Sequence, residues 1–267
     1  MNKPDLIDTH CHLNFDAYDD DRDAVIQRAV KAGVRRMIIP ATDLTTSREA
    51  IALAEQYDGI YAAVGIHPNS TADFDESLID QIAALADHPK VIAIGEIGLD
   101  YYWDKSPPEQ QQRAFRAQLE LATRLELPVI IHNRDAGPDV MGILTPWAPT
   151  VAEHMRQRPG VMHSFSAPVE IAERALAAGF YLGFTGPLTF KKAEDLRKIA
   201  RRVPIHRVLI ETDGPFLTPE PYRGRRNEPA YVLHVADRLG SLHRLPLDEI
   251  ARLTTANAER LFNLPAS

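Results

Sequence analysis

Two histidines near the N-terminus have the types and spacing that could do metal chemistry. His10 and His12 close the segment Leu6–His12, which begins as a short apolar run. Side chains two positions apart on a strand project from the same face, so both imidazoles can point at one object. Neutral imidazoles that converge in this way suit a divalent metal ion. A His pair alone is a weak signal, because one His could be a hydrogen-bonded polar residue and the other exposed.

Further metal-ligating side chains stand in or directly after four later apolar runs. They are Glu96, His132, His163 and Asp213. A carboxylate inside an apolar strand is costly unless it is paired or binds a metal. Glu96 could instead meet a structural Arg, and the two histidines could be core residues bonded to carbonyl groups. Taken together with the N-terminal pair, the six side chains predict a shared metal site.

The number of donors favours two divalent ions. A catalytic metal ion keeps about three or four protein ligands and an open position for water. A bridging carboxylate would let six donors serve two ions, and Glu96 is the candidate. One ion would then take His10, His12, Glu96 and Asp213, and the other Glu96, His132 and His163. Mixed imidazole and carboxylate ligands accept Zn, Mn, Ni or Fe, whereas Mg is less suited to so many imidazoles.

The elements that must position these donors are eight short apolar runs that alternate with amphipathic segments. The expected strands are 6–9, 34–41, 60–66, 91–97, 127–131, 160–162, 180–184 and 208–210. The expected helices are 20–32, 45–57, 75–87, 108–125, 138–157, 169–178 and 193–202, with 229–239 and 246–262 as closing helices. This alternation implies parallel strands and predicts an α/β fold, the (β/α)8 TIM barrel. In such barrels the active site lies at the carboxyl ends of the strands, where the donors stand.

The chain of 267 residues has the size of one such barrel, and 45% hydrophobic residues provide a core. Because no linker rich in Gly or Ser interrupts the sequence, we expect a single hydrolase domain over residues 1–267. The segment 138–149 contains three prolines, Pro138, Pro146 and Pro149, and the last two must break or kink a helix. Since the segment follows the fifth strand, we expect it near the mouth of the barrel.

Charge and cysteine content narrow the function classes. The net charge of −7 argues against a broad basic surface for nucleic acid, so a phosphate substrate must be bound locally. Cys11 is the only cysteine, which excludes an internal disulfide, and we expect it to be a small buried residue. No apolar stretch approaches a membrane span, and the segment 1–5 lacks the apolar core of a signal peptide. We therefore expect a cytoplasmic protein that does not associate with a membrane. We also expect it to be a monomer without an obligate protein partner.

From Asp8 almost to the C-terminus, the sequence resembles the TatD family of metal-dependent DNases and hydrolases. The motifs that carry the resemblance are Asp8–His12, Gly65–Pro68, Gly95–Tyr102, Leu127–Arg134, His163–Ser166, Glu211–Asp213, Arg223–Pro229 and Asn257–Phe262. The resemblance implies the barrel, a divalent metal site at the same His, Glu and Asp positions, and hydrolysis of phosphodiester bonds in DNA or RNA, often from the 3′ end. Ser164 and Gly214 depart from the usual family residues, Cys at the first position and Ser, Ala or Cys at the second.

The expected mechanism is in-line attack on a phosphodiester by a water held by the metal ions. Asp213 would bind one ion and assist proton transfer, with Glu96 as the second catalytic carboxylate; Glu211 could steady the ligands or form a structural ion pair. Some family members instead remove D-amino acids from tRNA, which is one alternative. Another is a small-ester or phosphotriester hydrolase on the same barrel, but there a carboxylated lysine often stands where this chain has Glu96. A non-catalytic binding protein would not need the complete ligand set.

Candidate substrate contacts are less specific. His67 ends the third expected strand and could contact substrate or cap a turn. Arg134 and Arg223 offer the forked guanidinium that phosphate favours, and Arg225 shares this chemistry, although each could also clamp a loop. The aromatic residues 101–103 could stack on bases, but we expect at least two of them to pack their own loop.

Overall fold

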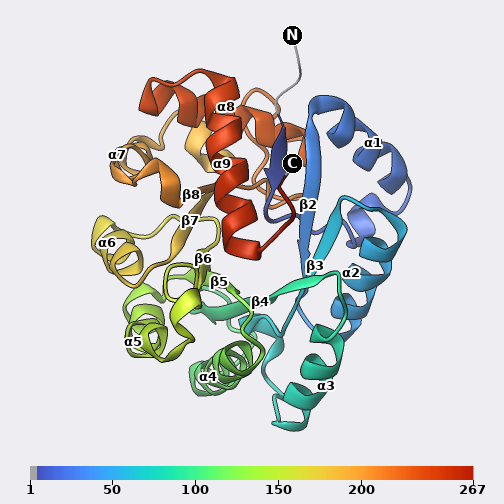
Figure 1. Cartoon of the computed structure of the whole chain (residues 1–267), viewed down its shortest axis with the longest axis vertical. Coiled ribbons are helices and arrows are strands. Elements are labelled where there is room, and N and C mark those ends of the chain that lie inside the picture. Colours follow the sequence, from blue (N-terminus) through green and yellow to red (C-terminus); the bar gives the residue numbers. More distant parts are fainter. Residues whose placement is uncertain (1–4, 267) are drawn as a thin grey trace. The chain divides into compact units, whose positions relative to one another are not determined.

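The computed structural model describes residues 5–266, in which strands alternate with helices (Figure 1). The strands are β1 (Leu6–Asp8), β2 (Val34–Pro40), β3 (Ile60–Val64), β4 (Val91–Asp100), β5 (Val129–Arg134), β6 (Gly160–Met162), β7 (Tyr181–Phe184) and β8 (Val208–Ile210). The helices are α1 (Arg22–Ala32), α2 (Leu44–Gln56), α3 (Ser77–Ala86), α4 (Pro108–Leu125), α5 (Gly137–Trp147), α6 (Val169–Ala177), α7 (Glu194–Arg202), α8 (Val232–His243) and α9 (Leu247–Phe262). Residues 1–4 and 267 lie outside the described residues. The segment 1–5, which we expect not to be a signal peptide, therefore falls mostly outside them.

The contacts divide the described chain into two compact units. The first unit comprises residues 5–39, 164–166 and 182–266, and the second comprises residues 40–163 and 167–181. Each unit contains its own helices and its own parallel strands. The expected single domain over residues 1–267 stays a prediction.

The second unit contains four neighbouring parallel strands in the order β3, β4, β5 and β6. β4 and β5 continue to Asp100 and Arg134, further than the sequence pattern predicted. The cause is their mutual pairing, in which Leu99 faces Asn133 and Asp100 faces Arg134. A backbone ladder with a neighbour keeps polar residues extended that no apolar pattern marks as strand.

Gly98 lets β4 and β5 approach each other closely beside the site. It pairs with His132 and has a φ of +142°, a conformation that side chains with a Cβ rarely adopt. A Cβ at this position would lie 2.1 Å from the carbonyl oxygen of His132. The close approach of β4 and β5 at this position therefore requires glycine. It lies two residues after Glu96, whose side chain reaches His132 on β5.

Helix α5 ends earlier than predicted. The expected helix over residues 138–157 ends at Trp147, and two 3-10 turns, Ala148–Thr150 and Glu153–Met155, follow it. Pro146 lies in the last turn of α5. Because proline has no backbone N–H and its ring crowds the preceding turn, the α-helix cannot continue through Pro146 and Pro149.

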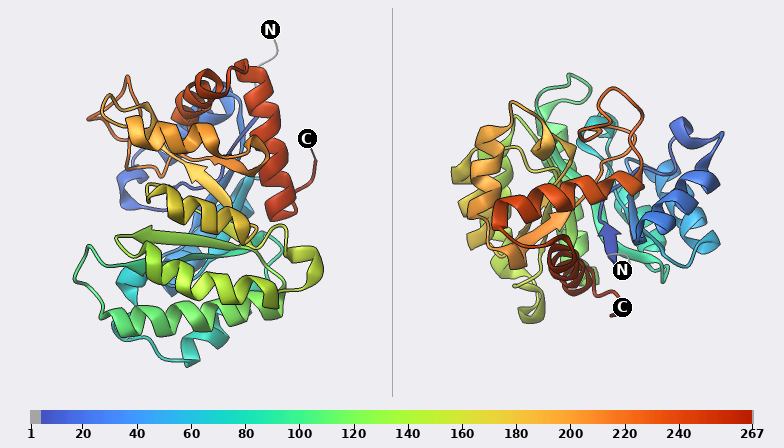
Figure 2. Two further views of the ribbon diagram at one scale, coloured as in Figure 1. Left: turned by 90° about the vertical axis from the view of Figure 1, so that its left-hand side faces the viewer. Right: turned by 90° about the horizontal axis from the view of Figure 1, so that it is seen from above.

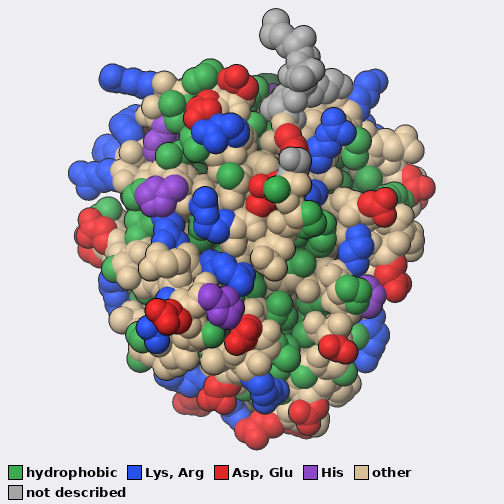
Figure 3. Space-filling view, in the orientation of Figure 1, with side chains coloured by type: hydrophobic (Ala, Val, Ile, Leu, Met, Phe, Trp, Pro, Cys, Tyr) green, Lys and Arg blue, Asp and Glu red, His purple; other side chains and the backbone are tan. Residues whose placement is uncertain are grey.

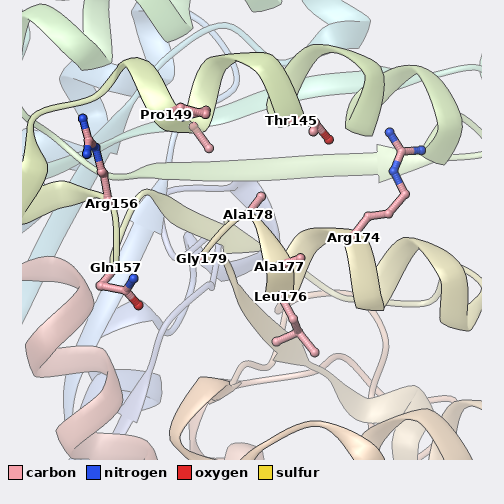
Figure 4. Close-up of a pocket in the computed structure, with 10 residues that line it drawn as sticks. Thr145, Pro149, Arg156, Gln157, Arg174, Leu176, Ala177, Ala178 and Gly179 are labelled. Atoms are coloured by element: carbon pink, nitrogen blue, oxygen red, sulfur yellow. The ribbon is translucent and has the colours of Figure 1, made fainter.

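The expectation that the segment 138–149 lies near the mouth of the barrel is met at its start, where Asp139 bonds to the hydroxyl of Tyr101 directly after β4 over 2.8 Å, but not at its end. The end of α5 lines a pocket with Arg156 and Gln157, which precede β6, and with the C-terminal end of α6 (Figure 4). α5 lies beside α6 (Figure 2, left). A crossover helix returns the chain to the amino end of the next parallel strand. Pro149 therefore lies at the end of the strands opposite to the one where the predicted ligands stand.

The first unit contains the paired strands β7 and β8 and the paired strands β1 and β2, all parallel. The N–H of Thr9 donates to the carbonyl of Ile210 over 3.2 Å, which joins the segment after β1 to β8. α9 packs against β1 and β8, and α8 packs against α9 (Figure 1). Cys11 is fully buried, as expected.

The surface carries charges of both signs. On the face seen in Figure 3, Lys and Arg side chains are interspersed with Asp and Glu side chains. In residues 5–266, no helix is both long enough and apolar enough to cross a membrane.

Candidate metal centre

Three imidazoles converge on one carboxylate oxygen in the second unit. The Oε1 atom of Glu96 lies 2.7 Å from Nδ1 of His132 and 3.0 Å from Nε2 of His163. Nε2 of His67 lies 3.7 Å from the same oxygen. Glu96 is only 3% exposed, so its charge needs close partners. We call these four residues the Glu96 cluster.

The strand ladder sets the geometry of this cluster. The backbone N–H of Glu96 donates to Ala41 over 2.9 Å, and that of His163 donates to Ile131 over 3.0 Å. The N–H of His67 donates to Thr42 over 2.9 Å. The backbones of these three residues are thus held by hydrogen bonds to neighbouring segments, which sets where their side chains begin.

Asp100 is a site residue that the sequence reasoning missed. Its Oδ2 atom lies 2.9 Å from Nε2 of His132, and its Oδ1 atom accepts from the backbone N–H groups of Tyr102 and Trp103 over 3.0 and 3.1 Å. Burial alone would raise the pKa of Asp100, but the hydrogen bonds from His132 and the backbone outweigh it and lower that pKa to about 2. Asp100 is therefore a carboxylate at neutral pH.

A signal for Asp100 was present in the sequence. Residues four apart on a strand share a face, so Asp100 belongs to the face of Glu96 once β4 is known to continue that far. The apolar pattern alone predicts a strand that ends at Ile97, so it gives Asp100 no position.

Two carboxylates hold the imidazole of His132. Its Nδ1 faces Glu96 and its Nε2 faces Asp100. Burial would lower the pKa of His132, but hydrogen bonds to Asp100 and Glu96 outweigh burial and raise it. In the neutral form, a proton on Nε2 donated to Asp100 leaves the lone pair of Nδ1 on the side of Glu96. A carboxylate behind a histidine orients metal ligands in this way.

The first unit contains a cluster formed by His10, His12 and Asp213. Nε2 of His10 and Nε2 of His12 are 3.3 Å apart. They lie 3.6 and 3.5 Å from Oδ1 of Asp213. We call these three residues the Asp213 cluster. Both histidines are buried, and Asp213 is partly buried.

Backbone pairing also builds the Asp213 cluster. The N–H of Asp213 donates to His10 over 2.8 Å, and the N–H of His12 donates to Gly214 over 2.8 Å. Asp213 has a φ of +56°, a left-handed conformation that is uncommon for a residue with a Cβ. At Gly214 a Cβ would lie 2.6 Å from the hydroxyl of Tyr18. The tyrosine therefore accounts for glycine at this departure from the family pattern.

Asp8 and Glu211 form hydrogen bonds with residues in or beside the Asp213 cluster. Asp8 accepts hydrogen bonds from the backbone of His10 over 3.3 Å and from the backbone and hydroxyl of Thr212. Burial raises the pKa of Asp8 to about 8, opposed by these hydrogen bonds. Glu211 accepts from the hydroxyl of Thr9 over 3.3 Å and from the backbone of Ser164 over 2.9 Å. Both carboxyl groups fix the chain beside the predicted ligands.

The donor sets fit divalent ions. His67, Glu96 and His132 place one potential ligand atom each within 4.8 Å of one another. Each cluster combines imidazole nitrogens with a carboxylate oxygen, the ligand types that Zn, Mn, Ni and Fe accept. The structure therefore brings together Glu96, His132, His163 and His67 in one unit, and His10, His12 and Asp213 in the other.

The predicted substrate contacts fall in different places. His67 joins the Glu96 cluster, and its Nδ1 also accepts from the N–H of Asn69, so it caps a turn as well. Arg134 is exposed at the end of β5, with its guanidinium 4.0 Å from the ring centre of Tyr102. Arg223 is exposed in the first unit, where its guanidinium lies 4.0 Å from the ring centre of Phe190.

The expectation that at least two of the aromatic residues 101–103 pack their loop was wrong. Tyr101 does so, because its hydroxyl bonds to Asp139 and Gln112. Tyr102 and Trp103 are 54% and 49% exposed.

Comparisons with known proteins agree with this architecture. A family model described as TatD related DNase matches residues 7–263. The chain is 46% identical to an uncharacterized metal-dependent hydrolase, YabD of Bacillus subtilis, covering 97% of this chain and 99% of that protein. It is 37% identical to a 3′-5′ ssDNA/RNA exonuclease TatD of Erwinia tasmaniensis, covering 97% and 100%.

The fold is shared with a solved structure. The crystal structure of YjjV, a TatD homologue from Escherichia coli K12, matches with a TM-score of 0.89 at 36% identity and covers 97% of this chain and 98% of that one. The strand and helix order together with this likeness confirms the predicted (β/α)8 barrel.

Proposed function

The chain belongs to the TatD family of metal-dependent hydrolases that act on ester bonds, and on that basis we propose that it is a nuclease that removes nucleotides from the 3′ ends of DNA or RNA. The observation that carries the proposal is the convergence of His67, His132 and His163 on one oxygen of Glu96. A relative named as a 3′-5′ ssDNA/RNA exonuclease supports the choice of substrate.

We assign the metal ligands as the sequence suggested. His10, His12 and Asp213 would bind one divalent ion and His132 and His163 a second, with Glu96 shared by both. Bound ions of this kind lower the pKa of water, orient the phosphoryl oxygen and stabilise the leaving oxygen. Zn, Mn, Ni and Fe suit these ligands better than Mg.

The residues of the chain would bind, orient and move protons in this reaction. Asp213 would accept the proton of the attacking water through its carboxylate. Asp100 keeps the imidazole of His132 in one orientation. Arg134 and Arg223 would hold the phosphates of the substrate through their guanidinium groups, and His67 would contact the reacting phosphate.

The cellular setting belongs to the same proposal. The enzyme would act in the cytoplasm as a monomer and as a single domain, with nucleic acid as its substrate and without an obligate protein partner.

Three substrates decide the function. The purified protein is incubated with a 3′-labelled single strand, a D-aminoacyl-tRNA and a small aryl ester, each with added divalent metal and with chelator. We expect loss of the 3′ label that the chelator stops. Release of the D-amino acid alone would make the protein a D-aminoacyl-tRNA deacylase. Turnover of the aryl ester alone would make it a small-ester hydrolase, and either result would refute the nuclease.

A further inference from the structure

Two neighbouring aromatic rings after β4 are exposed to solvent. Tyr102 and Trp103 are 54% and 49% exposed, and their rings lie edge to face with centres 4.9 Å apart. Among the described residues, the only other large hydrophobic side chains exposed to this extent are Val30 and Phe216. Burial of an aromatic ring is favourable. Neighbouring rings that stay exposed in the free protein are therefore typical of binding surfaces.

The same carboxylate fixes this aromatic pair and a predicted metal ligand. Oδ1 of Asp100 accepts from the backbone N–H groups of Tyr102 and Trp103, and Oδ2 of Asp100 contacts Nε2 of His132. The N–H of Tyr101 also donates to Arg134 over 2.9 Å, which continues the pairing of β4 with β5. The rings therefore stand at a fixed place directly beyond the Glu96 cluster, within the same compact unit.

Arg134 completes the surface. Its guanidinium lies 4.0 Å from the ring centre of Tyr102 and 5.8 Å from that of Trp103, the arrangement of a cation over aromatic faces. Among residues 5–266, Arg134 forms no ion pair with a carboxylate. A guanidinium over a ring can still donate its N–H groups to a phosphate at the edge of the ring.

We propose that Tyr102, Trp103 and Arg134 form a stacking platform for an unpaired base of a single-stranded nucleic acid next to the reacting end. This inference rests on the proposed nuclease function and names the feature of the substrate that is recognised. Aromatic rings stack on any base, whereas a rigid guanidinium bonds to the adjacent phosphate. A base in a duplex is already stacked, so the platform favours single strands.

Intrinsic fluorescence gives a test that does not depend on turnover. The chain has two tryptophans, and Trp147 is buried with its indole N–H bonded to Thr123. In Trp147→Phe, Trp103 is the only indole. The metal-loaded variant is titrated with a hydrolysis-resistant phosphorothioate oligonucleotide, the complete strand. It is also titrated with the same oligonucleotide carrying abasic sites at its two 3′-terminal positions, the abasic strand. We expect strong quenching by the first and little by the second. Equal quenching by both, or none by either, would overturn the platform.

Kinetics gives a second test. In Tyr102→Ala and Trp103→Ala, we expect the ratio of kcat/KM for the complete strand to that for the abasic strand to fall about 5-fold to 100-fold, the usual range for loss of one stacked base. Phe at either position should restore most of the ratio. Val30→Ala removes another exposed apolar side chain, in α1, and should leave the ratio unchanged. An unchanged ratio in both aromatic variants would refute the proposal.

The two proposals fail separately. If the wild-type protein cleaves no single strand, the nuclease function fails, while quenching of Trp103 still decides whether the platform binds a base. If single strands are cleaved but the complete and abasic strands quench Trp103 equally, the platform fails and the nuclease function remains.

Discussion

The carboxylate of Asp100 and the imidazole of His132 are joined by a contact of 2.9 Å between Oδ2 and Nε2. The other ring nitrogen of His132 faces Glu96. Asp100 therefore decides which nitrogen of His132 is presented to the predicted metal ion, although Asp100 itself is not a predicted ligand. The turn with Tyr102 and Trp103 depends on the same carboxylate, so ligand orientation and the proposed base contact are structurally coupled.

Asp100→Asn should weaken metal binding about 10-fold to 100-fold, the usual effect of removing a carboxylate behind a metal-bound histidine. The amide can still contact His132 but no longer favours a proton on Nε2. Metal affinity is measured by competition with a chromogenic chelator. Asp104→Asn, at an exposed position in the same loop, is the control and should bind metal as the wild type does. An unchanged affinity in Asp100→Asn would show that Asp100 serves only the loop.

The assignment of two ions predicts unequal effects of two carboxylate variants. Asp213→Asn should abolish turnover and lower the metal content by one ion per chain, because it removes a ligand of one ion only. Glu96→Gln should also abolish turnover and lower the content by more, because Glu96 would serve both. Elemental analysis after gel filtration measures the content. Glu120→Gln and Asp237→Asn, at exposed helix positions, are the matched controls. Full turnover by Asp213→Asn would remove Asp213 from the mechanism.

Substitutions at two glycines distinguish the effect of close strand packing on stability from the effect of helix propensity. Gly98→Ala should lower the free energy of unfolding by about 3 kcal/mol or more, because the added Cβ meets the carbonyl of His132 and the φ is unfavourable. Gly142→Ala, in α5 with open space around it, should raise that free energy by about 0.5–1 kcal/mol. Urea unfolding followed by circular dichroism measures both. Equal stability of Gly98→Ala and the wild type would contradict the close approach of β4 and β5.

Much of this architecture could be predicted from the sequence because its strongest signals are local. Buried strands in a parallel sheet are short apolar runs, and the helices between them have apolar residues at helical spacing. The end of α5 at Trp147 could also have been placed, since Pro146 and Pro149 forbid a helix that continues to residue 157. The prediction went wrong there because apolar spacing was followed past the prolines.

The parts that escaped prediction depend on neighbours distant in sequence. β4 continues to Asp100 because it pairs with β5, and no residue between 97 and 100 indicates that pairing. The role of Asp100 followed from that extension. The exposure of Tyr102 and Trp103 likewise depends on how Asp100 holds their backbone, which composition does not reveal. The predicted metal ligands gave a clearer signal in the sequence, because buried imidazoles and carboxylates conflict with apolar runs.

A charge network in the first unit connects α1 to the segment after β8. Arg226 contacts Asp21 with both terminal nitrogens, over 2.8 and 2.9 Å. Arg28 bridges Asp21 and Glu228 over 3.1 and 2.8 Å. The hydrogen bonds from Arg226 and then from Arg28 lower the pKa of Asp21 to about 2, against an ordinary value of 3.8.

The lowered pKa of Asp21 gives a stability effect with a definite sign. A carboxyl group whose pKa is lower in the folded state stabilises that state above its unfolded pKa, and the effect is lost as the pH falls toward the folded value. Asp21→Asn should therefore lower the free energy of unfolding by about 1 kcal/mol at pH 7, a modest value because water screens the network. The difference from the wild type should shrink between pH 4 and pH 2, and also in 1 M salt at pH 7. Urea unfolding at each pH measures it, with Asp20→Asn at the neighbouring exposed position as the control. A difference that stayed constant across this pH range would mean that Asp21 stabilises the protein through packing and not through its charge.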